Sequence, residues 1–245
     1  MQIEQYERFY ALEDKHWWFV GMRDIFYRTI NNIYKNNNNL LILDVGCGTG
    51  MMMRGLEKFG KVVGIDIEGA ALKFCQKKDI NKVCFGSGVK LPFKDATFDL
   101  VTAFSVVEHV QDDVSFIQEL SRVCKNSGRI VLSTSAFNFL WSEHDLINKH
   151  KRRYTKDNLQ KMFNRQHLLV EKITYTNFIL FPLILPAVFL SNLLKYFHVS
   201  LTDAYYATPK LINRILISIL RTESLILSKS NFPFGISLLC VGKKA

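Results

Sequence analysis

No paired cysteine motif, signal peptide or internal repeat is recognisable in the sequence. Its five cysteines are odd in number and scattered, and none forms a CxxC pair, so the sequence does not predict a disulfide framework. The first residues are polar and of mixed charge, unlike a secretory leader. These absences favour a cytoplasmic protein with reduced, mostly buried thiols, and we predict no metal site.

Composition sets broad limits on the fold and its partners. Hydrophobic residues make up 48% of the 245 positions, which is enough for a sizeable core. The formal net charge of +10 suits an anionic partner such as nucleic acid, a phosphate-bearing substrate or an acidic membrane surface. Sequences rich in lysine and asparagine often carry such a charge for other reasons, so the charge does not choose among these partners.

Charged and aromatic residues alternate at helical spacing near the start of the chain. Over residues 4–34 this pattern predicts two amphipathic helices, with Trp17 and Trp18 near their junction. The polar stretch Asn36 to Asn39 is typical of a linker. We therefore expect residues 1–39 to form an N-terminal helical cap.

From residue 40 onward, short apolar segments alternate with amphipathic ones. This alternation is typical of an α/β fold with a parallel sheet, right-handed crossovers and helices on both faces. The predicted strands are residues 40–43, 61–67, 82–85, 97–104 and 129–133, and the predicted helices are residues 51–58, 70–78 and 112–124. Ligands in such sheets bind at the carboxyl ends of the strands, near the point where the strand order reverses.

The pattern changes after the fifth strand. Thr155 can cap a helix that ends near residue 164. No charged residue occurs from Ile173 to Leu194, a span that contains Pro182 and Pro186. The later predicted elements are a strand at 168–176, a helix at 211–227 and a last strand at 236–241, closed by Gly242, Lys243 and Lys244. The predicted division is a core of residues 40–177, a helical insertion of residues 178–232 and a last core strand within residues 233–245.

The stretch LLILDVGCGTGM at residues 40–51 dominates the functional interpretation. A buried strand runs into Asp44 and a turn with glycines at 46, 48 and 50. Position 51 is Met, so the GxGxxG turn of dinucleotide-binding proteins is absent. Asp66 at the end of the next strand can accept hydrogen bonds from both hydroxyls of a ribose, and Asp44 can hold an ammonium group directly or through water. The pattern favours a nucleoside site without a pyrophosphate.

The motifs LDVGCGTG, GIDI, LPFKDATFDLV and VVEHV together resemble the class I S-adenosylmethionine-dependent methyltransferases over residues 40–134. The resemblance implies a Rossmann-like seven-stranded sheet of order 3-2-1-4-5-7-6 with the last strand antiparallel. It also implies S-adenosyl-L-methionine as cofactor and S-adenosyl-L-homocysteine as product. The cofactor-binding residues that it implies are Asp44, Gly46, Cys47, Gly48, Gly50, Asp66, Ile67, Ser87, Gly88, Val89 and Phe104. Ser87 stands where the family usually has Asp, so we expect somewhat weaker adenine recognition.

The flanking segments resemble a narrower group of bacterial methyltransferases of the methyltransferase-11 type. The shared blocks are HWWF at residues 16–19 followed by Arg23, W-S-x-H-D-x4-H-x-R-R-Y-T at 141–155, and P-x-G-x-S at 233–237. This group is linked mainly to modification of glycans, lipids and secondary metabolites. Trp18 and Arg23 are predicted to cover the cofactor as a lid, although a packed contact between two helices explains them equally well.

Polar residues after the fifth strand are the candidates for acceptor chemistry. His144 beside Asp145 is a natural general-base pair, and His150 is a second candidate base. The alternative is that these side chains only hold the loop together by hydrogen bonds. Arg153 and Tyr154 are predicted to bind the substrate, although a solvated basic face is an equally good interpretation.

Glu108 and His109 follow the fourth strand. A histidine there can reach an acceptor, but the family resemblance favours a structural or cofactor-proximal place for this pair. We therefore leave both residues out of the predicted catalytic set.

The leading hypothesis is a methyltransferase that acts on a small-molecule or lipid- or glycan-linked acceptor by in-line displacement, with a histidine general base. The apolar insertion is predicted to form a lid that can rest on the inner membrane surface, with a buried helix pair, a dimer contact or a membrane span as alternatives. A nucleic-acid methyltransferase is disfavoured, because AFSVVEHV replaces the proline-proline-aromatic motif of base-amine methyltransferases. A non-catalytic cofactor-binding protein is the second alternative. Neither the acceptor atom nor the oligomeric state is predicted.

Overall fold

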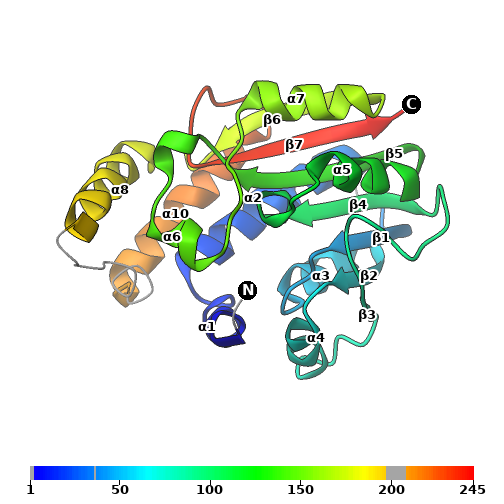
Figure 1. Ribbon diagram of the computed structural model, residues 1–245, viewed down its shortest axis with the longest axis horizontal. Helices are drawn as coiled ribbons and strands as arrows, with labels where there is room; N and C mark the ends of the chain where they lie inside the picture. The colour runs from blue at the N-terminus through cyan, green and yellow to red at the C-terminus, as the bar shows by residue number, and fades with distance from the viewer. Residues whose placement is uncertain (1–2, 36, 197–207) are drawn as a thin grey trace.

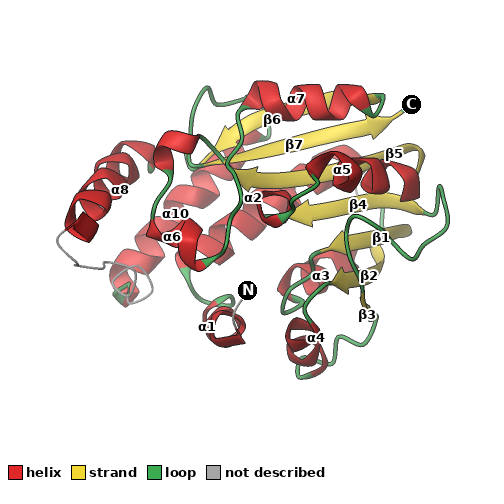
Figure 2. Cartoon of the chain, in the orientation of Figure 1, coloured by secondary structure: helices red, strands yellow, loops and turns green. Residues whose placement is uncertain are grey.

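The computed structural model describes residues 3–35, 37–196 and 208–245. Seven strands form one sheet in the order β3-β2-β1-β4-β5-β7-β6, with helices on both of its faces (Figure 1, Figure 2). Strands β1 to β5 pair in parallel, whereas β7 runs antiparallel to both β5 and β6. The predicted sheet order and the antiparallel last strand are confirmed.

The elements follow the predicted alternation closely. The strands are β1 (Leu40–Val45), β2 (Gly60–Asp66), β3 (Val83–Phe85), β4 (Phe98–Phe104), β5 (Cys124–Ser135), β6 (Leu168–Thr176) and β7 (Ser237–Lys244). The α-helices are α1 (Ile3–Leu12), α2 (Trp17–Tyr34), α3 (Met51–Leu56), α4 (Gly69–Gln76), α5 (Asp113–Val123), α6 (Glu143–Ile147), α7 (Lys156–Arg165), α8 (Phe181–Tyr196) and α10 (Lys210–Leu227). Three short 3-10 turns are η1 (Glu57–Phe59), η2 (Val107–His109) and η3 (Asn138–Leu140).

One face of the sheet is covered by α5 and α7. Phe116, Ile117 and Leu120 recur at helical spacing on α5 and are fully buried against the strands. Thr155 caps α7, and its side chain and that of Asn158 bond each other's backbone N–H groups in a capping box. The predicted cap at Thr155 is therefore confirmed.

The other face is covered by α2 and α10, which pack against each other. Met22, Ile25 and Ile30 on α2 are buried in the apolar cluster on this face. Gly21 allows the close approach of α10, because a Cβ atom at this position would lie 2.2 Å from the Leu220 side chain. Two segments from opposite ends of the chain thus share one layer (Figure 1).

Two strands are longer than the sequence predicted. β5 begins at Cys124, which pairs with Phe98, rather than at residue 129. The predicted end of the last strand at Val241 was wrong, because the ladders with β5 and β6 continue to Lys243 and Lys244 and satisfy this backbone.

The two prolines of the apolar insertion, Pro182 and Pro186, lie within one helix, α8. Pro182 lies in the first turn, where the backbone N–H has no partner inside a helix, so its missing N–H costs little. Pro186 lies one turn later, and the helix continues to Tyr196. Among the described residues, no helix is long and apolar enough to cross a membrane.

Glu223 on α10 fixes the chain segment that leads from β6 into α8. Its buried carboxylate accepts hydrogen bonds from the backbone N–H groups of Asn177 and Ile179, and burial raises the pKa of Glu223. These bonds hold the start of the insertion against the core. Residues 197–207 of the predicted insertion, and residue 36 of the predicted linker, lie outside the described residues.

Candidate active site

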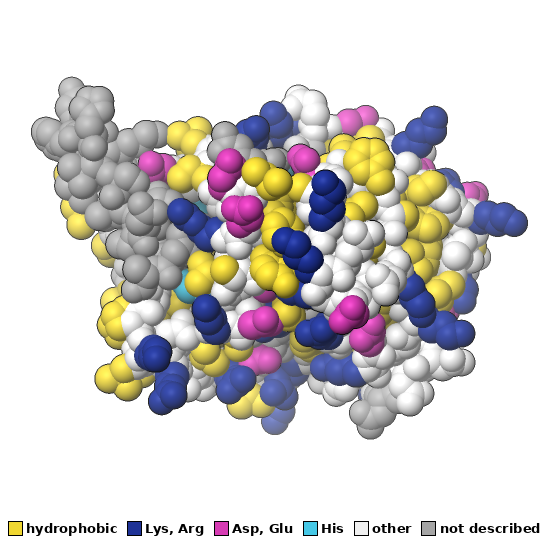
Figure 3. Space-filling view, turned by 90° about the horizontal axis from the view of Figure 1, so that it is seen from below, with side chains coloured by type: hydrophobic (Ala, Val, Ile, Leu, Met, Phe, Trp, Pro, Cys, Tyr) yellow, Lys and Arg dark blue, Asp and Glu magenta, His cyan; other side chains and the backbone are white. Residues whose placement is uncertain are grey.

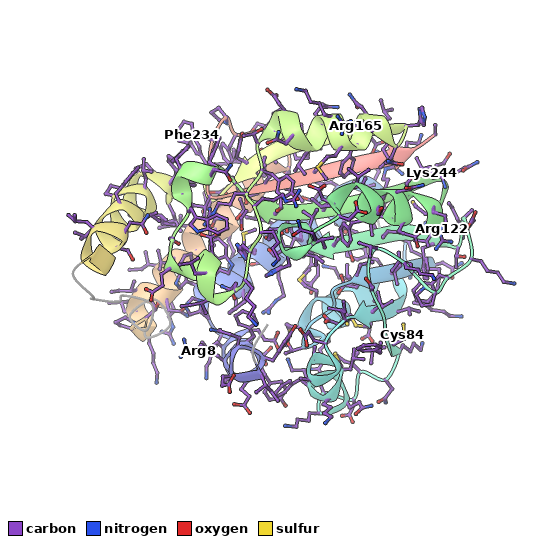
Figure 4. The ribbon with its side chains drawn as sticks, viewed as in Figure 1. Arg8, Cys84, Arg122, Arg165, Phe234 and Lys244 are labelled. Carbon is purple, nitrogen blue, oxygen red and sulfur yellow. The ribbon has the colours of Figure 1, made fainter. Side chains whose placement is uncertain are left out.

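A cavity of about 630 Å³ lies at the carboxyl ends of the parallel strands. β7 runs the other way and begins at this edge, whereas Arg122 and Lys244 mark the opposite edge (Figure 4). The strand ends and the turns after them contribute Val45, Gly46, Cys47, Ile65, Asp66, Phe104, Ser105, Ser135 and Ser237 to the lining. The cavity therefore lies where the strand order predicted a ligand.

The glycine-rich turn after β1 exposes backbone to this cavity. Gly46 (φ +73°) and Gly48 (φ +54°) have left-handed backbone conformations, which side-chain-bearing residues rarely adopt. A Cβ atom at Gly46 would lie 2.4 Å from Val106, whereas no described atom lies within 4 Å of the corresponding position at Gly48. Gly48 therefore leaves room for a ligand to approach the main chain.

Asp66 at the end of β2 has both carboxylate oxygens oriented by the backbone. Oδ2 accepts a hydrogen bond from the Gly48 N–H at 2.8 Å, and Oδ1 accepts one from the Glu68 N–H at 2.9 Å. Burial raises the pKa of Asp66, and the two backbone donors oppose this effect. Each oxygen keeps a lone pair for a further donor, so this cavity-lining side chain fits the pair of ribose hydroxyls that the sequence assigned to it.

Asp44 lies beside the turn and is only 2% exposed. Its Oδ1 accepts a hydrogen bond from Thr102 Oγ1 at 2.7 Å, whereas Oδ2 has no hydrogen-bond partner among the described residues. Burial raises the pKa of Asp44 to about 7. A buried carboxylate oxygen without a donor is costly, so this residue fits a site for a cation. Because Asp44 does not itself line the cavity, contact with an ammonium group through water is better supported than direct contact.

The other predicted cofactor residues divide into two groups. Cys47, Ile67, Ser87, Gly88, Val89 and Phe104 all line the cavity. The Phe104 ring stacks on Phe26, with ring centroids 4.2 Å apart. Gly50 does not line the cavity. It is the N-cap of α3 and has a left-handed backbone conformation, with φ +82°. The predicted direct contact of Gly50 with the cofactor is therefore not supported, and its role is to turn the chain into α3.

The N-terminal helices close the cavity beside the glycine-rich turn. Trp18 and Arg23 line the cavity, where the sequence placed a lid. Trp17 instead packs against Leu180 and Leu220, from the insertion. Further lining residues from these helices, which were not among the predicted cofactor-binding residues, are Tyr6, Phe9, Phe19, Met22 and Phe26.

Glu13, between α1 and α2, anchors this cap to the glycine-rich turn. Its buried carboxylate accepts a hydrogen bond from Thr49 Oγ1 and forms an ion pair with Lys78. Its backbone carbonyl accepts a hydrogen bond from the Arg23 guanidinium. No motif indicated this role, because Glu13 lies 36 residues before Thr49 and only the fold brings the two together.

Three histidines meet at another part of the cavity wall. The ring centroids of His109 and His150 are 4.7 Å apart, and those of His144 and His150 are 5.9 Å apart. All three line the cavity. His150 Nδ1 lies 2.7 Å from Asp145 Oδ1, so the histidine that Asp145 orients is His150, whereas the sequence favoured the adjacent His144. Sequence neighbours on a helix point in different directions, which explains the correction.

Arg153 and Tyr154 do not line the cavity, and both side chains are buried. Arg153 donates through Nε and Nη2 to the two carboxylate oxygens of Asp145, at 2.8 Å each. The Tyr154 hydroxyl donates to Asp113 at 2.9 Å. The structure thus contradicts a direct substrate contact for either residue: Arg153 positions Asp145, and Tyr154 ties the loop to α5.

Burial and neighbouring charge keep two of the histidines neutral. Burial, together with His150, lowers the pKa of His109 to about 4. Desolvation and the neighbouring His150 also lower the pKa of His144, and because this residue is partly open to solvent the effect is screened. Glu108, beside them, accepts a hydrogen bond from Thr134 Oγ1 at 2.9 Å, and burial raises the pKa of Glu108. Residues 108 and 109, left out of the predicted set, are therefore part of the cavity wall.

The basic residues do not form one continuous tract on the face shown in Figure 3, where acidic and hydrophobic side chains lie between them. Within the basic run after α6, Arg152 pairs with Asp113 and Arg153 pairs with Asp145. Two of its cations are therefore already engaged inside the protein, which leaves fewer of them for an external polyanion.

Residues 43–132, from β1 into β5, match a family model described as a methyltransferase domain. This segment is therefore similar to methyltransferase domains, in agreement with the class I fold of the sheet. The likeness implies S-adenosyl-L-methionine as the methyl donor and S-adenosyl-L-homocysteine as its product. The buried, half-satisfied Asp44, the open backbone at Gly48 and the oriented carboxylate of Asp66 fit this cofactor.

Named proteins resemble this chain over the methyltransferase domain. A demethylmenaquinone methyltransferase of Lactiplantibacillus plantarum is 34% identical over 110 residues, which cover 40% of this chain and 46% of that protein. A ubiquinone biosynthesis O-methyltransferase of Coxiella burnetii is 32% identical over 106 residues, which cover 40% and 44%. The chain thus spans less than half the length of these relatives, and the likeness is confined to the methyltransferase domain.

Solved structures resemble a larger part of the chain. A methyltransferase of Haloferax volcanii, in complex with the Trm112 methyltransferase activator, has a TM-score of 0.62 and 15% identity, covering 98% of this chain and 94% of that one. A SAM-dependent methyltransferase of Thermotoga maritima has a TM-score of 0.59 and 15% identity, covering 99% and 96%. At this identity the likeness shows the fold alone, and it extends beyond the methyltransferase domain to the flanking helices.

Proposed function

We propose that this chain is an S-adenosylmethionine-dependent methyltransferase whose acceptor is a small molecule or a lipid- or glycan-linked group. In this proposal His150 is the general base, Asp145 orients it and Arg153 holds Asp145. The observation that carries the proposal is that the His150–Asp145 pair borders the same cavity as Gly48 and Asp66. In this proposal one cavity contains both the residues for the methyl donor and a base for the acceptor.

The residues around the glycine-rich turn would hold the donor. When bound, S-adenosylmethionine supplies a methyl group that its sulfonium makes electrophilic. In this proposal Asp66 accepts from the ribose hydroxyls, Ile67 and Ser87 border the adenine, and the backbone at Gly48 faces the methionine tail. The main work of the protein is then to align the acceptor and exclude water.

Asp145 decides which nitrogen of His150 is basic. Because Nδ1 faces a carboxylate at 2.7 Å, we assign the ring hydrogen to Nδ1 and leave Nε2 to accept a proton. Although burial opposes it, the hydrogen bonds from His150 and Arg153 lower the pKa of Asp145, so the carboxylate stays ionised. His150 Nε2 would then take the proton that an acceptor hydroxyl or amine loses as the methyl group is transferred.

Neutral polar groups and the carboxyl groups of Glu108 and Asp112 make up the wall near the histidines, which favours an acceptor without negative charge. His109 and His144 have lowered pKa values, and Ser105, Gln111 and Asn148 add neutral polar groups. The relatives whose names refer to demethylmenaquinone and to ubiquinone biosynthesis also favour a small or lipid-linked acceptor over a nucleic acid. We propose that the protein acts in the cytoplasm or at a membrane surface that faces it.

The test is to incubate the purified chain with S-adenosylmethionine labelled on its methyl group and with an extract of host cells. The label is then partitioned among lipid, glycan, small-molecule, protein and RNA fractions. We expect the label in a lipid, glycan or small-molecule fraction, and we expect His150→Gln to lower the rate of labelling by about 10²-fold. The exposed histidine at 167 provides a matched control, since His167→Gln leaves the cavity unchanged.

The outcomes separate the competing functions. Label that appears only in RNA would support a nucleic-acid methyltransferase instead. No label in any fraction, with normal cofactor binding by calorimetry, would support a non-catalytic cofactor-binding protein. Full transfer by the His150→Gln variant would remove His150 as the base while leaving the methyltransferase assignment intact.

A further inference from the structure

We propose that α8 and the first half of α10 rest on the surface of an anionic lipid bilayer. The proposal rests on the proposed function only in its last step, where the surface delivers a lipid-linked acceptor to the cavity. The surface is defined here as the exposed side chains of residues 182–193 and 210–215.

Large apolar side chains are exposed along α8. Leu183 is 72% exposed, and Phe189 and Leu193 are each more than half exposed. The helix sequence FPLILPAVFLSNLLKY carries no acidic residue. Leaving this much apolar surface in water is unfavourable, so the surface is expected to be covered when the protein works.

The first half of α10 adds apolar residues with cations among them. Leu211, Ile212 and Ile215 are exposed, and Lys210 and Arg214 are exposed beside them. The stretch KLINRILIS has no acidic residue. Cations that border an apolar face are typical of helices that lie on anionic lipids. α8 and the start of α10 lie at the same end of the molecule (Figure 1).

A shallow groove of about 440 Å³ on α10 suits a single lipid. Ile179, Ile215 and Ile219 give it apolar walls, and Arg214 adds a cation. Apolar walls suit acyl carbons, and a guanidinium suits the phosphate of a headgroup. A protein partner would instead be expected to find a polar rim along the contact, whereas residues 181–190 of α8 carry no polar or charged side chain.

The proposed surface adjoins the loop that carries the candidate base. Asn192 on α8 donates a hydrogen bond through Nδ2 to the Trp141 carbonyl at 2.8 Å. Trp141 lies just before α6, which carries His144 and Asp145. A lipid-linked acceptor held at the bilayer would thus approach the histidine side of the cavity.

The test is flotation of the full chain with vesicles of phosphatidylcholine alone and of phosphatidylcholine with phosphatidylglycerol. We expect at least about tenfold stronger binding to the anionic vesicles, because Lys210 and Arg214 both contribute. Leu183→Asp and Leu211→Asp should each weaken this binding about tenfold or more, since each removes a large apolar side chain from the contact. Leu169→Asp is the matched control, because Leu169 on β6 is 65% exposed but lies outside the surface.

Two results would overturn the proposal. One is that the chain does not float with anionic vesicles. This result includes the case in which the exposed surface is instead a contact between two copies of the chain, so that Leu183→Asp and Leu211→Asp abolish self-association alone. The other is an equal loss of flotation in Leu169→Asp, which would show a nonspecific effect of charge. Cofactor binding by calorimetry is measured on every variant, so that failure of the methyltransferase function is seen separately from failure of lipid binding.

Discussion

The two sides of the cavity are built in different ways. The donor side, meaning the part of the wall proposed to bind the methyl donor, consists of backbone and of side chains at the ends of adjacent strands, with Gly48 after β1 and Asp66 at the end of β2. The acceptor side, meaning the part of the wall proposed to face the acceptor, consists of side chains from separate loops, with His109 after β4 and His150 after α6. A parallel sheet is enough to bring the residues of the donor side together, whereas the residues of the acceptor side come together only when several loops pack against one another. The donor side can therefore be recognised by motif, and the acceptor side cannot.

The two sides also differ in charge. Burial raises the pKa values of Asp44 and Asp66 on the donor side, which suits a cationic ligand that restores their charge. On the acceptor side the ionised Asp145 is already matched by Arg153, and His109 and His144 have lowered pKa values. The side proposed for the donor thus has a buried carboxylate oxygen without a described partner, whereas the side proposed for the acceptor places the oriented His150 beside two histidines of lowered pKa.

The largest expected effect is on the donor side. Asp66→Ala should weaken cofactor binding by about 10²–10⁴-fold, because two hydrogen bonds to a charged carboxylate, each worth roughly 1.5–3 kcal/mol, are lost. Isothermal titration calorimetry measures the change. Asp157→Ala, at an exposed position in the first turn of α7, is the matched control. Unchanged affinity in Asp66→Ala would refute the ribose site.

On the acceptor side, His150→Gln should lower kcat by about 10²-fold while the dissociation constant of the cofactor stays the same. The expected loss lies at the low end for a general base, because Gln can still bond Asp145 and two other histidines remain near. His144→Ala should reduce kcat less than His150→Gln. The reverse order would restore His144 as the base that the sequence favoured.

Cofactor affinity should depend on pH through Asp44. Since the pKa of Asp44 is raised to about 7 in the free protein, its carboxyl group is protonated below that pH, and a cationic ligand then meets a neutral group. Affinity should thus be flat above pH 7 and fall by up to about tenfold per pH unit below it. Calorimetry at several pH values checks this slope, and Asp44→Asn should reduce it. A flat profile in the unaltered protein would exclude Asp44 as the linked group.

The smallest expected effect concerns the cap. Thr49→Val removes the hydroxyl that donates a hydrogen bond to Glu13 but keeps the Glu13–Lys78 ion pair. Cofactor affinity should therefore fall by about tenfold or less. The same change at Thr97, whose hydroxyl donates to the Lys94 carbonyl away from the cavity, should leave affinity unchanged. Stopped-flow binding should show faster cofactor release in Thr49→Val, since the cap is held less firmly. Equal release rates would mean that the cap does not retain the cofactor.

Most of the sheet could be predicted from local pattern. Within the methyltransferase motifs, each buried strand is a run of apolar residues followed by a loop that contains glycine or an acidic residue. The predicted ends of β1 and β2 therefore agree with the observed ends to within one or two residues. Strand ends that depend on a partner were less accurate. Cys124 and Lys244 extend β5 and β7 only because neighbouring strands pair with them, and no local signal marks such pairing.

By itself, the sequence determined which residues lie at the edge proposed for the donor: Asp44, Gly46, Gly48 and Asp66 lie at or just after the ends of β1 and β2, and the parallel sheet brings these ends together. Only the tertiary structure decided that Asp145 orients His150, that Arg153 and Tyr154 are buried supports, and that Glu13 reaches Thr49. The physical reason is that side-chain direction and long-range pairing depend on how α1, α6 and the loops pack on the sheet. Spacing along the chain does not specify that packing.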